Sequence, residues 1–221
     1  MDKELTLLLE LMPGYNEMEI EGQNMYQGHI GQHEVILSKC GIGKVNSALR
    51  TYRIIHAFHP ELVINSGVAG GADASVAIGT LLVADGAAYH DVWCGPGTVE
   101  GDADGCPRIF RPWPRGMEIV NSMLPSHHGM QTGLIATGDR FISTADEVAA
   151  IKSLYPEAKA CDMESASIAQ ACMACDVPFM VARVVSDTPG SGNNMSQYKN
   201  FFAEAPAKTF ALLNEILVQI D

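Results

Sequence analysis

Short apolar runs bounded by Gly and Pro alternate along this chain with segments whose apolar residues recur at helical spacing. This alternation is typical of α/β proteins, in which helices cover a parallel or mixed sheet. No linker or change in composition interrupts it, so we expect one domain over residues 1–221. The expected strands cover residues 34–38, 62–66, 80–84, 131–136 and 179–186, and the expected helices 1–12, 44–58, 144–154, 164–175 and 196–220.

The charge balance limits the kind of partner. The chain carries 26 acidic and 14 basic side chains, a formal net charge of −12. A surface of that sign repels a nucleic-acid backbone or an anionic membrane. We therefore expect a small neutral or cationic ligand, and neither nucleic acid nor membrane as a partner.

The cysteines and histidines give no pattern of a metal or redox site. Six cysteines are scattered along the chain, and several lie in apolar runs, which favours a reducing cytoplasm. Cys172 and Cys175 have the spacing of a redox pair, but they fall inside a predicted helix, where core packing is the better interpretation. No Cys/His cluster has zinc spacing, and the N-terminus lacks a signal-peptide pattern. We expect no metal site.

The segment ARVVSDTPGSG, residues 182–192, places a carboxylate after a run of β-branched residues. Val184 and Val185 indicate a buried strand, and Thr188-Pro189-Gly190 is turn chemistry that ends it. Asp187 therefore lies at the carboxyl end of a strand, where open α/β sheets bind ligands. A turn or cap residue is the alternative. Burial at such a position would raise the pKa of the carboxyl and make it a proton donor near neutral pH.

Two further segments at predicted strand ends carry candidate ligand groups. The glycines of NSGVAGG, residues 65–71, allow close approach of the backbone to a ligand, and their amides could hold an anion or a hydroxyl. In ACDMESASIA, residues 160–169, Asp162, Met163 and Glu164 lie between a short strand and a helix. Acidic residues there could simply cap the helix. They could equally accept hydrogen bonds from a ribose, with the Met against the sugar.

The segment at residues 93–114 is the irregular part of the chain, with four prolines and four glycines. It is too long for an ordinary connection, and such loops usually act as lids or interface segments.

Taken together, these segments resemble the nucleoside phosphorylase/hydrolase superfamily, and within it the bacterial 5′-methylthioadenosine/S-adenosylhomocysteine nucleosidases. The resemblance extends over nearly the whole chain. The matching pieces occur in the family's order: SKCGIGKVNSA (38–48), INSGVAGG (64–71), YHD (89–91), TGDRFIS (137–143), DMESASIA (162–169) and ARVVSD (182–187).

The resemblance implies a three-layer α/β/α fold with a central mixed sheet, and a homodimer. It also implies hydrolysis of the N-glycosidic bond of an adenine thionucleoside without metal or cofactor. Asp187 would protonate purine N7, and Glu4, in a segment similar to the one that carries the family's Glu, would activate water. The substrate would contact Ile42, Val68, Ala69, Gly70, Phe141, Ile142, Asp162, Met163, Glu164 and Tyr198.

The chain also departs from the family pattern. It begins at Met1 without the family's usual first strand, which would weaken the anchor of Glu4. Val68 stands where relatives often have Ser or Thr. Two other activities stay open: a purine nucleoside phosphorylase of the same fold, and a truncated relative that binds nucleosides without catalysis. A phosphorylase would need Arg side chains around the glycine loop. None is nearby in sequence, although Arg140 or an Arg of a partner subunit could reach it.

Overall fold

The computed structural model describes residues 2–204 and 206–220. Its strands form two sheets. The first is antiparallel and contains β1 (Asn16–Ile20), β2 (Gln23–Ile30) and β3 (His33–Ser38). The second is mixed and closes into a barrel in the order β4-β7-β6-β5-β8. Its strands are β4 (Val63–Gly71), β5 (Leu81–Tyr89), β6 (Met130–Thr137), β7 (Ala158–Asp162) and β8 (Phe179–Asp187).

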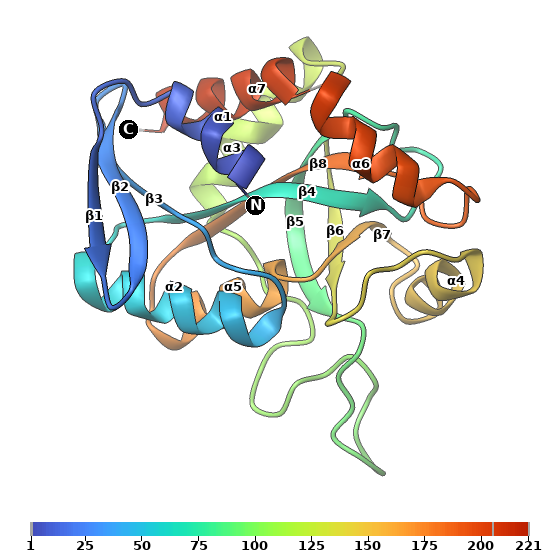
Figure 1. Ribbon diagram of the computed structural model, residues 1–221. Coiled ribbons are helices and arrows are strands. Elements are labelled where there is room, and N and C mark those ends of the chain that lie inside the picture. The colour runs from blue at the N-terminus through green and yellow to red at the C-terminus, as the bar shows by residue number, and fades with distance from the viewer. Residues whose placement is uncertain (1, 205, 221) are drawn as a thin grey trace.

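The helices lie on both sides of the barrel, which confirms the expected α/β/α arrangement (Figure 1). On the lower side in that view are α2 (Lys44–Phe58) and α5 (Ser165–Ala174). The upper side holds α1 (Asp2–Glu10), α3 (Pro114–Met123), α6 (Asn194–Glu204) and α7 (Pro206–Gln219). Helix α4 (Ala145–Leu154) packs at one end of the barrel, and a short 3-10 turn, η1 (Leu124–Ser126), follows α3. Within the described residues, no helix is both long enough and apolar enough to cross a membrane.

Several predicted elements agree closely with the structure. Helix α2 has the predicted bounds, 44–58. Helix α4 begins at a capping box in which the Thr144 side chain accepts from the Glu147 amide and the Glu147 side chain accepts from the Thr144 amide. Helix α1 lies within the helix predicted over residues 1–12.

Other elements differ from the prediction. The single closing helix expected over residues 196–220 is two helices, because Pro206 begins α7 and has no amide hydrogen to continue α6. Strands β1 and β2 and helix α3 were not predicted. Helix α3 begins at Pro114, a residue that the sequence pattern assigned to the irregular loop.

The pairing of the strands brings the carboxyl ends of the barrel strands together. Gly70 at the end of β4 pairs with Cys161 of β7 and with Asp187 of β8. Thr137 at the end of β6 pairs with Tyr89 of β5 and with Asp162 of β7. All the sequence segments singled out as strand-end candidates therefore meet at one end of the barrel.

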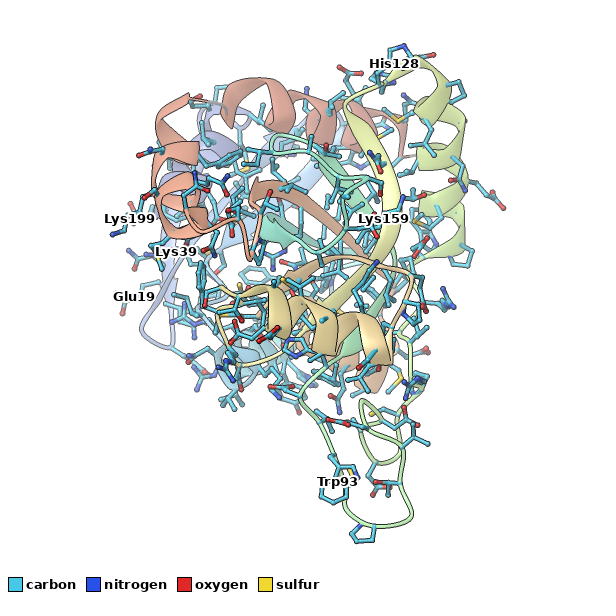
Figure 2. All side chains as sticks on the ribbon, turned by 90° about the vertical axis from the view of Figure 1, so that its right-hand side faces the viewer. Glu19, Lys39, Trp93, His128, Lys159 and Lys199 are labelled. Carbon is cyan, nitrogen blue, oxygen red and sulfur yellow. The ribbon has the colours of Figure 1, made fainter. Side chains whose placement is uncertain are left out.

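The irregular loop between β5 and α3 projects from the body of the protein on the side of α2 and α5 (Figures 1 and 2). Trp93, labelled near its tip in Figure 2, is 63% exposed. The base of the loop is held by the bridge between Ala87 and Phe110. Since the loop extends away from the barrel, its geometry suits an interface segment better than a lid.

Candidate active site

Asp187 is the last residue of β8 and is almost completely buried, with 2% of its surface exposed. Ser186 Oγ donates to Asp187 Oδ1 at 2.7 Å, and Asn194 Nδ2 approaches Oδ2 at 3.5 Å. Burial raises the pKa of the Asp187 carboxyl, and the hydrogen bonds from Ser186 and Asn194 offset part of that effect. The group is therefore a carboxylic acid that keeps its proton to a higher pH than a solvated aspartate.

An aromatic and amide surface lies next to this acid. The ring of Phe141 contacts the ring of Tyr198 edge to face, with centroids 5.6 Å apart. Ile142 is buried, and its carbonyl accepts from Asn194 Nδ2 at 3.3 Å, so that one amide connects Ile142 to Asp187. Phe141 is 37% exposed, which leaves a ring face available to a flat ligand.

Glu164 contacts Arg183, a residue of β8, the strand that also carries Asp187. Arg183 Nη2 donates to Glu164 Oε2 at 3.2 Å, and the amide of Gly43 donates to Glu164 Oε1 at 3.0 Å. Burial raises the pKa of Glu164, while the Arg183 charge opposes this change. The contacts of the two carboxyl groups differ, because the Arg183 guanidinium beside Glu164 favours its ionised form, whereas Asp187 accepts from the neutral side chains of Ser186 and Asn194.

Asp162 has a structural role in the site. It accepts from the hydroxyl of Thr137 at 2.6 Å and from the amide and hydroxyl of Ser165, which begins helix α5. It also forms an ion pair with Arg183 at 3.1 Å. These contacts give Asp162 the capping role that the sequence left as an alternative, and they do not support its place among the residues expected to bind substrate.

Glu4 is held firmly, contrary to the expectation that a missing first strand would loosen it. Its side chain is 9% exposed, and Oε1 accepts from the amide of Val68 at 3.0 Å. A Cβ atom on Gly67 would lie 3.0 Å from Glu4 Oε1 and would collide with Arg183 Nη1. Glycine at position 67 is therefore what allows the acid and the arginine to approach the β4 backbone.

The remaining expected substrate positions lie around these groups. The side chains of Val68 and Ala69 pack in apolar clusters, so a ligand contact from either would come from the backbone. Met163 is partly exposed between Asp162 and Glu164. Ile42 is 62% exposed in the segment before α2, and Gly70 packs against Pro189 and Cys161.

Tyr198 shows that the acidic groups belong to one site. Burial raises the pKa of the Tyr198 phenol, and the charges of Glu4, Asp187 and Glu164 raise it further. The contacts of the three carboxyl groups agree with this. Glu4 accepts from the Val68 amide of β4, Asp187 pairs with Gly70 of the same strand, and Glu164 is held by Arg183 of β8. Residues from the two ends of the chain, 4 and 198, thus meet the strand ends in the middle of it.

Sequence reasoning missed three residues of this site. Arg183 is 4% exposed and also donates from Nη1 to the carbonyl of Val68 at 3.3 Å. Ser186 and Asn194 hold the acid, as described above. A signal for Arg183 was present, because a charged residue inside an apolar strand needs buried partners. The hydroxyl and amide carried no such signal.

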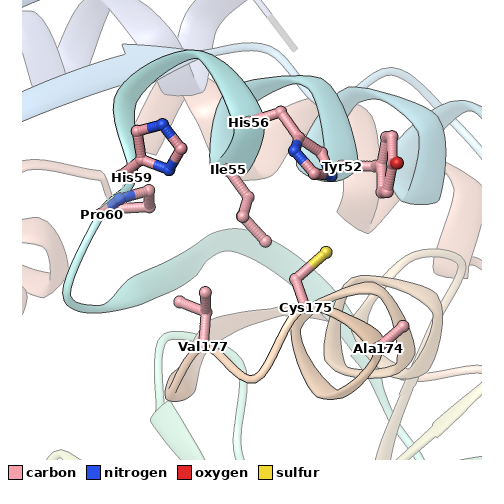
Figure 3. A pocket seen from close by; sticks show the side chains of 8 residues that line it. All are labelled: Tyr52, Ile55, His56, His59, Pro60, Ala174, Cys175 and Val177. Carbon is pink, nitrogen blue, oxygen red and sulfur yellow. The ribbon is translucent and has the colours of Figure 1, made fainter.

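A cavity of about 450 Å³ lies between α2 and α5, away from these groups (Figure 3). Its walls include Tyr52, His56 and Cys175. Within the described parts of the chain, no group of three or more His, Cys, Asp or Glu side chains is arranged to hold a metal ion.

Comparisons with known proteins agree with this geometry. The model of the phosphorylase superfamily matches residues 1–218. A 5′-methylthioadenosine/S-adenosylhomocysteine nucleosidase of Staphylococcus haemolyticus is 34% identical over 222 residues, covering 100% of this chain and 96% of that protein.

Two solved structures are similar over the whole chain. An S-adenosylhomocysteine nucleosidase from Streptococcus pyogenes, in complex with 5-methylthiotubericidin, has a TM-score of 0.94 and 34% identity and covers 100% of this chain and 94% of its own. A futalosine hydrolase of Helicobacter pylori has a TM-score of 0.92 and 27% identity, with 100% and 95% covered. The chain therefore belongs to the phosphorylase superfamily and, within it, to the family of 5′-methylthioadenosine/S-adenosylhomocysteine nucleosidases.

Proposed function

We propose that this protein hydrolyses the N-glycosidic bond of 5′-methylthioadenosine and S-adenosylhomocysteine and releases adenine. The observation that carries the proposal is the buried acid Asp187, which follows the same two strands, β4 and β8, that hold the carboxyl groups of Glu4 and Glu164. An acid for the leaving base, a carboxylate for the sugar and a carboxylate for water are the groups that this reaction needs.

The leaving base is activated by proton transfer from Asp187. Adenine lies against Phe141 and the backbone of Ile142, and Asp187 donates its proton to N7 as the bond between C1′ and N9 breaks. The bonding electrons move into the purine, which departs as neutral adenine. The ribosyl group develops positive charge at C1′, and the negative charges of Glu164 and Glu4 stabilise it.

Water completes the reaction from the opposite face of the sugar. Glu4 accepts a proton from the water while the water oxygen bonds to C1′, which gives the free 5-thio-substituted ribose. Glu164 accepts hydrogen bonds from the ribose hydroxyls, Met163 packs on the sugar, and Ile42 lines the space for the 5′ substituent. Tyr198 covers the ligand opposite the strand ends.

The charges around the glycine loop favour water over phosphate as the acceptor. The Val68 amide, which could have held an anion, donates to the carboxylate of Glu4. Arg140, the candidate phosphate ligand from the sequence, forms an ion pair with Glu147 at 2.7 Å and is 71% exposed. Arg183 lies in ion pairs with Asp162 and Glu164. A phosphate placed here would meet carboxylates where a phosphorylase needs basic groups.

We expect purified protein to release adenine from 5′-methylthioadenosine at the same rate with and without phosphate. Adenine release followed by absorbance in phosphate-free buffer checks this. Strict dependence on phosphate would instead identify a phosphorylase, and saturable binding without turnover would identify a binding protein. Parallel assays with S-adenosylhomocysteine and futalosine-type nucleosides establish which 5′ substituent is preferred.

We further propose that the protein acts as a homodimer through the α2–α5 face, defined by Val45, Leu49 and Tyr52 on α2 and Met173 on α5. These side chains are 69%, 54%, 51% and 42% exposed. Helix α2 turns Ser47 and Thr51 towards the core while these larger apolar residues face outward. This reversal of the usual amphipathic pattern supports burial by a second copy, and the projecting loop leaves the body on the same side (Figure 1).

Leu49→Glu is expected to convert the dimer to a monomer, because it places a charge at the centre of the α2–α5 face. Sedimentation velocity of the wild type and the variant measures the change. Val218→Glu is the matched control: Val218 is an exposed aliphatic residue on α7, 57% exposed, and its substitution should leave the mass unchanged. A wild-type protein that sediments as a monomer at micromolar concentration would refute the proposal.

The described cysteines support a cytoplasmic location as part of this proposal. All six are free thiols. Free thiols persist in a reducing compartment such as the cytoplasm.

A further inference from the structure

We propose that Asp91 and Lys44 are positioning residues that fix the distance between the base-binding and sugar-binding halves of the site. The base-binding loop is residues 138–142, and the sugar-binding loop is residues 41–44. This inference rests on the proposed function, because it assigns the two loops to the two ends of one nucleoside.

Asp91 connects the two loops directly. Its Oδ1 lies 2.7 Å from Lys44 Nζ at the start of α2, and its Oδ2 accepts from the amide of Asp139 at 2.8 Å. One carboxylate therefore holds the sugar-binding loop with one oxygen and the base-binding loop with the other. Lys44 and Asp91 are 22% and 27% exposed, so water still reaches both side chains of the pair.

A second contact runs in the opposite direction between the same loops. The amide of Lys44 donates to Asp139 Oδ1 at 2.7 Å. The neighbouring amide, that of Gly43, donates to Glu164 Oε1 at 3.0 Å. A shift of the 138–142 loop would therefore move the consecutive amides of Gly43 and Lys44 at the start of α2. The Gly43 amide orients the Glu164 carboxylate, which contacts the sugar.

Two glycines let the loops approach this closely. A Cβ atom on Gly43 would lie 2.8 Å from Asp139 Oδ1. A Cβ atom on Gly138 would collide with the ring of His90 and would lie 2.9 Å from Asp91 Cγ. Because the backbones pack directly on these polar groups, the contacts that Asp91 and Asp139 make between the two loops have little freedom to lengthen.

The position of these contacts between the two loops determines which ligands they affect. Phe141 and Ile142 follow Asp139 in one loop, and Ile42 and Gly43 precede Lys44 in the other. Free adenine contacts only the base-binding loop, whereas an intact nucleoside must fit both loops at once. An ion pair exposed by about a quarter contributes little to the free energy of unfolding, so its loss should change the spacing of the loops and leave the fold intact.

The test compares ligands that contact one loop with a ligand that contacts both. For Asp91→Asn, we expect kcat/KM for 5′-methylthioadenosine to fall about tenfold, since small errors of placement cost rate steeply. The inhibition constant of free adenine should stay within about twofold of the wild-type value. Asp91→Ala, which also removes the acceptor for the Asp139 amide, should give a larger fall, and Asp91→Glu should restore part of the activity.

Asp73→Asn is the matched control. Asp73 forms an ion pair of similar exposure with Lys152 at 2.5 Å, and it joins the segment after β4 to α4 instead of joining the two site loops. Its substitution should leave kcat/KM and the adenine constant unchanged. Equal weakening of adenine and nucleoside by Asp91→Asn, or an unchanged kcat/KM, would overturn the proposal. Wild-type protein without turnover would instead contradict the proposed function.

Discussion

Replacement of Asp187 by Asn is expected to lower kcat for 5′-methylthioadenosine by at least about a hundredfold, the usual cost of removing a general acid. Asparagine has nearly the same shape, and its carbonyl oxygen can still accept from Ser186, so the surrounding structure should persist. It has no acidic proton to transfer to N7. Adenine would then have to leave as an anion, which is a much poorer leaving group.

The pH dependence of the wild type gives a second measure of the same role. Burial raises the pKa of Asp187, and the reaction needs its protonated form. Activity should therefore persist above the pH at which a solvated aspartate ionises and should fall as the pH rises through the raised pKa. Asp187→Asn should lose this falling limb, since the group that titrates is gone.

Asp85→Asn is the control for nonspecific effects of removing a carboxyl group whose pKa is raised. Burial also raises the pKa of Asp85, but this residue lies within β5 and outside the site. Stopped-flow or steady-state adenine release should show wild-type rates for Asp85→Asn. A near-normal kcat for Asp187→Asn would remove Asp187 from the mechanism.

The local parts of this fold were predictable because their signals are local. Helix α2 begins after Gly43 and ends before Pro60, and both limits can be seen in the sequence. The Thr144 capping box also depends on residues within one turn. Asp187 was placed at a strand end by its β-branched neighbours and the turn that follows.

The non-local parts could not be predicted from spacing. The closure of the sheet into a barrel depends on the antiparallel contacts of β5 with β8 and of β4 with β7. No periodicity in the chain encodes which strands meet across such a distance. The contacts of Arg183 could not be predicted from spacing either, because its partners Asp162 and Glu164 become its neighbours only when β7 and β8 lie in one barrel.

The role of Glu4 illustrates how tertiary contacts replace a local anchor. The sequence predicted a weak anchor because no strand precedes this residue. The structure supplies other restraints: the contact with the Val68 amide, the glycine at position 67 and the burial of the Glu4 side chain, which is 9% exposed within α1. A carboxylate fixed in this way is held in one orientation, as a general base must be.

Glu4→Gln should therefore lower kcat by about a hundredfold or more while adenine still binds. The glutamine carbonyl can accept from the Val68 amide as the carboxylate does. The variant therefore removes the general base and keeps the hydrogen bond to Val68. Adenine release measures the rate, and the inhibition constant of adenine measures whether the base-binding loop is intact. Glu4→Ala, which loses the contact as well, should bind adenine no better than Glu4→Gln.

Added azide distinguishes a variant that has lost only the general base Glu4 from a variant whose active site is disrupted. Azide attacks C1′ without giving up a proton, so it needs Asp187 to protonate the departing adenine but does not need Glu4. We expect added azide to accelerate adenine release by Glu4→Gln and to form a glycosyl azide, because the variant also removes a negative charge that would repel the anion. Asp187→Asn should show no such recovery, since its missing step is protonation of the base. Azide rescue of both variants, or of neither, would contradict the division of labour between the two carboxyl groups.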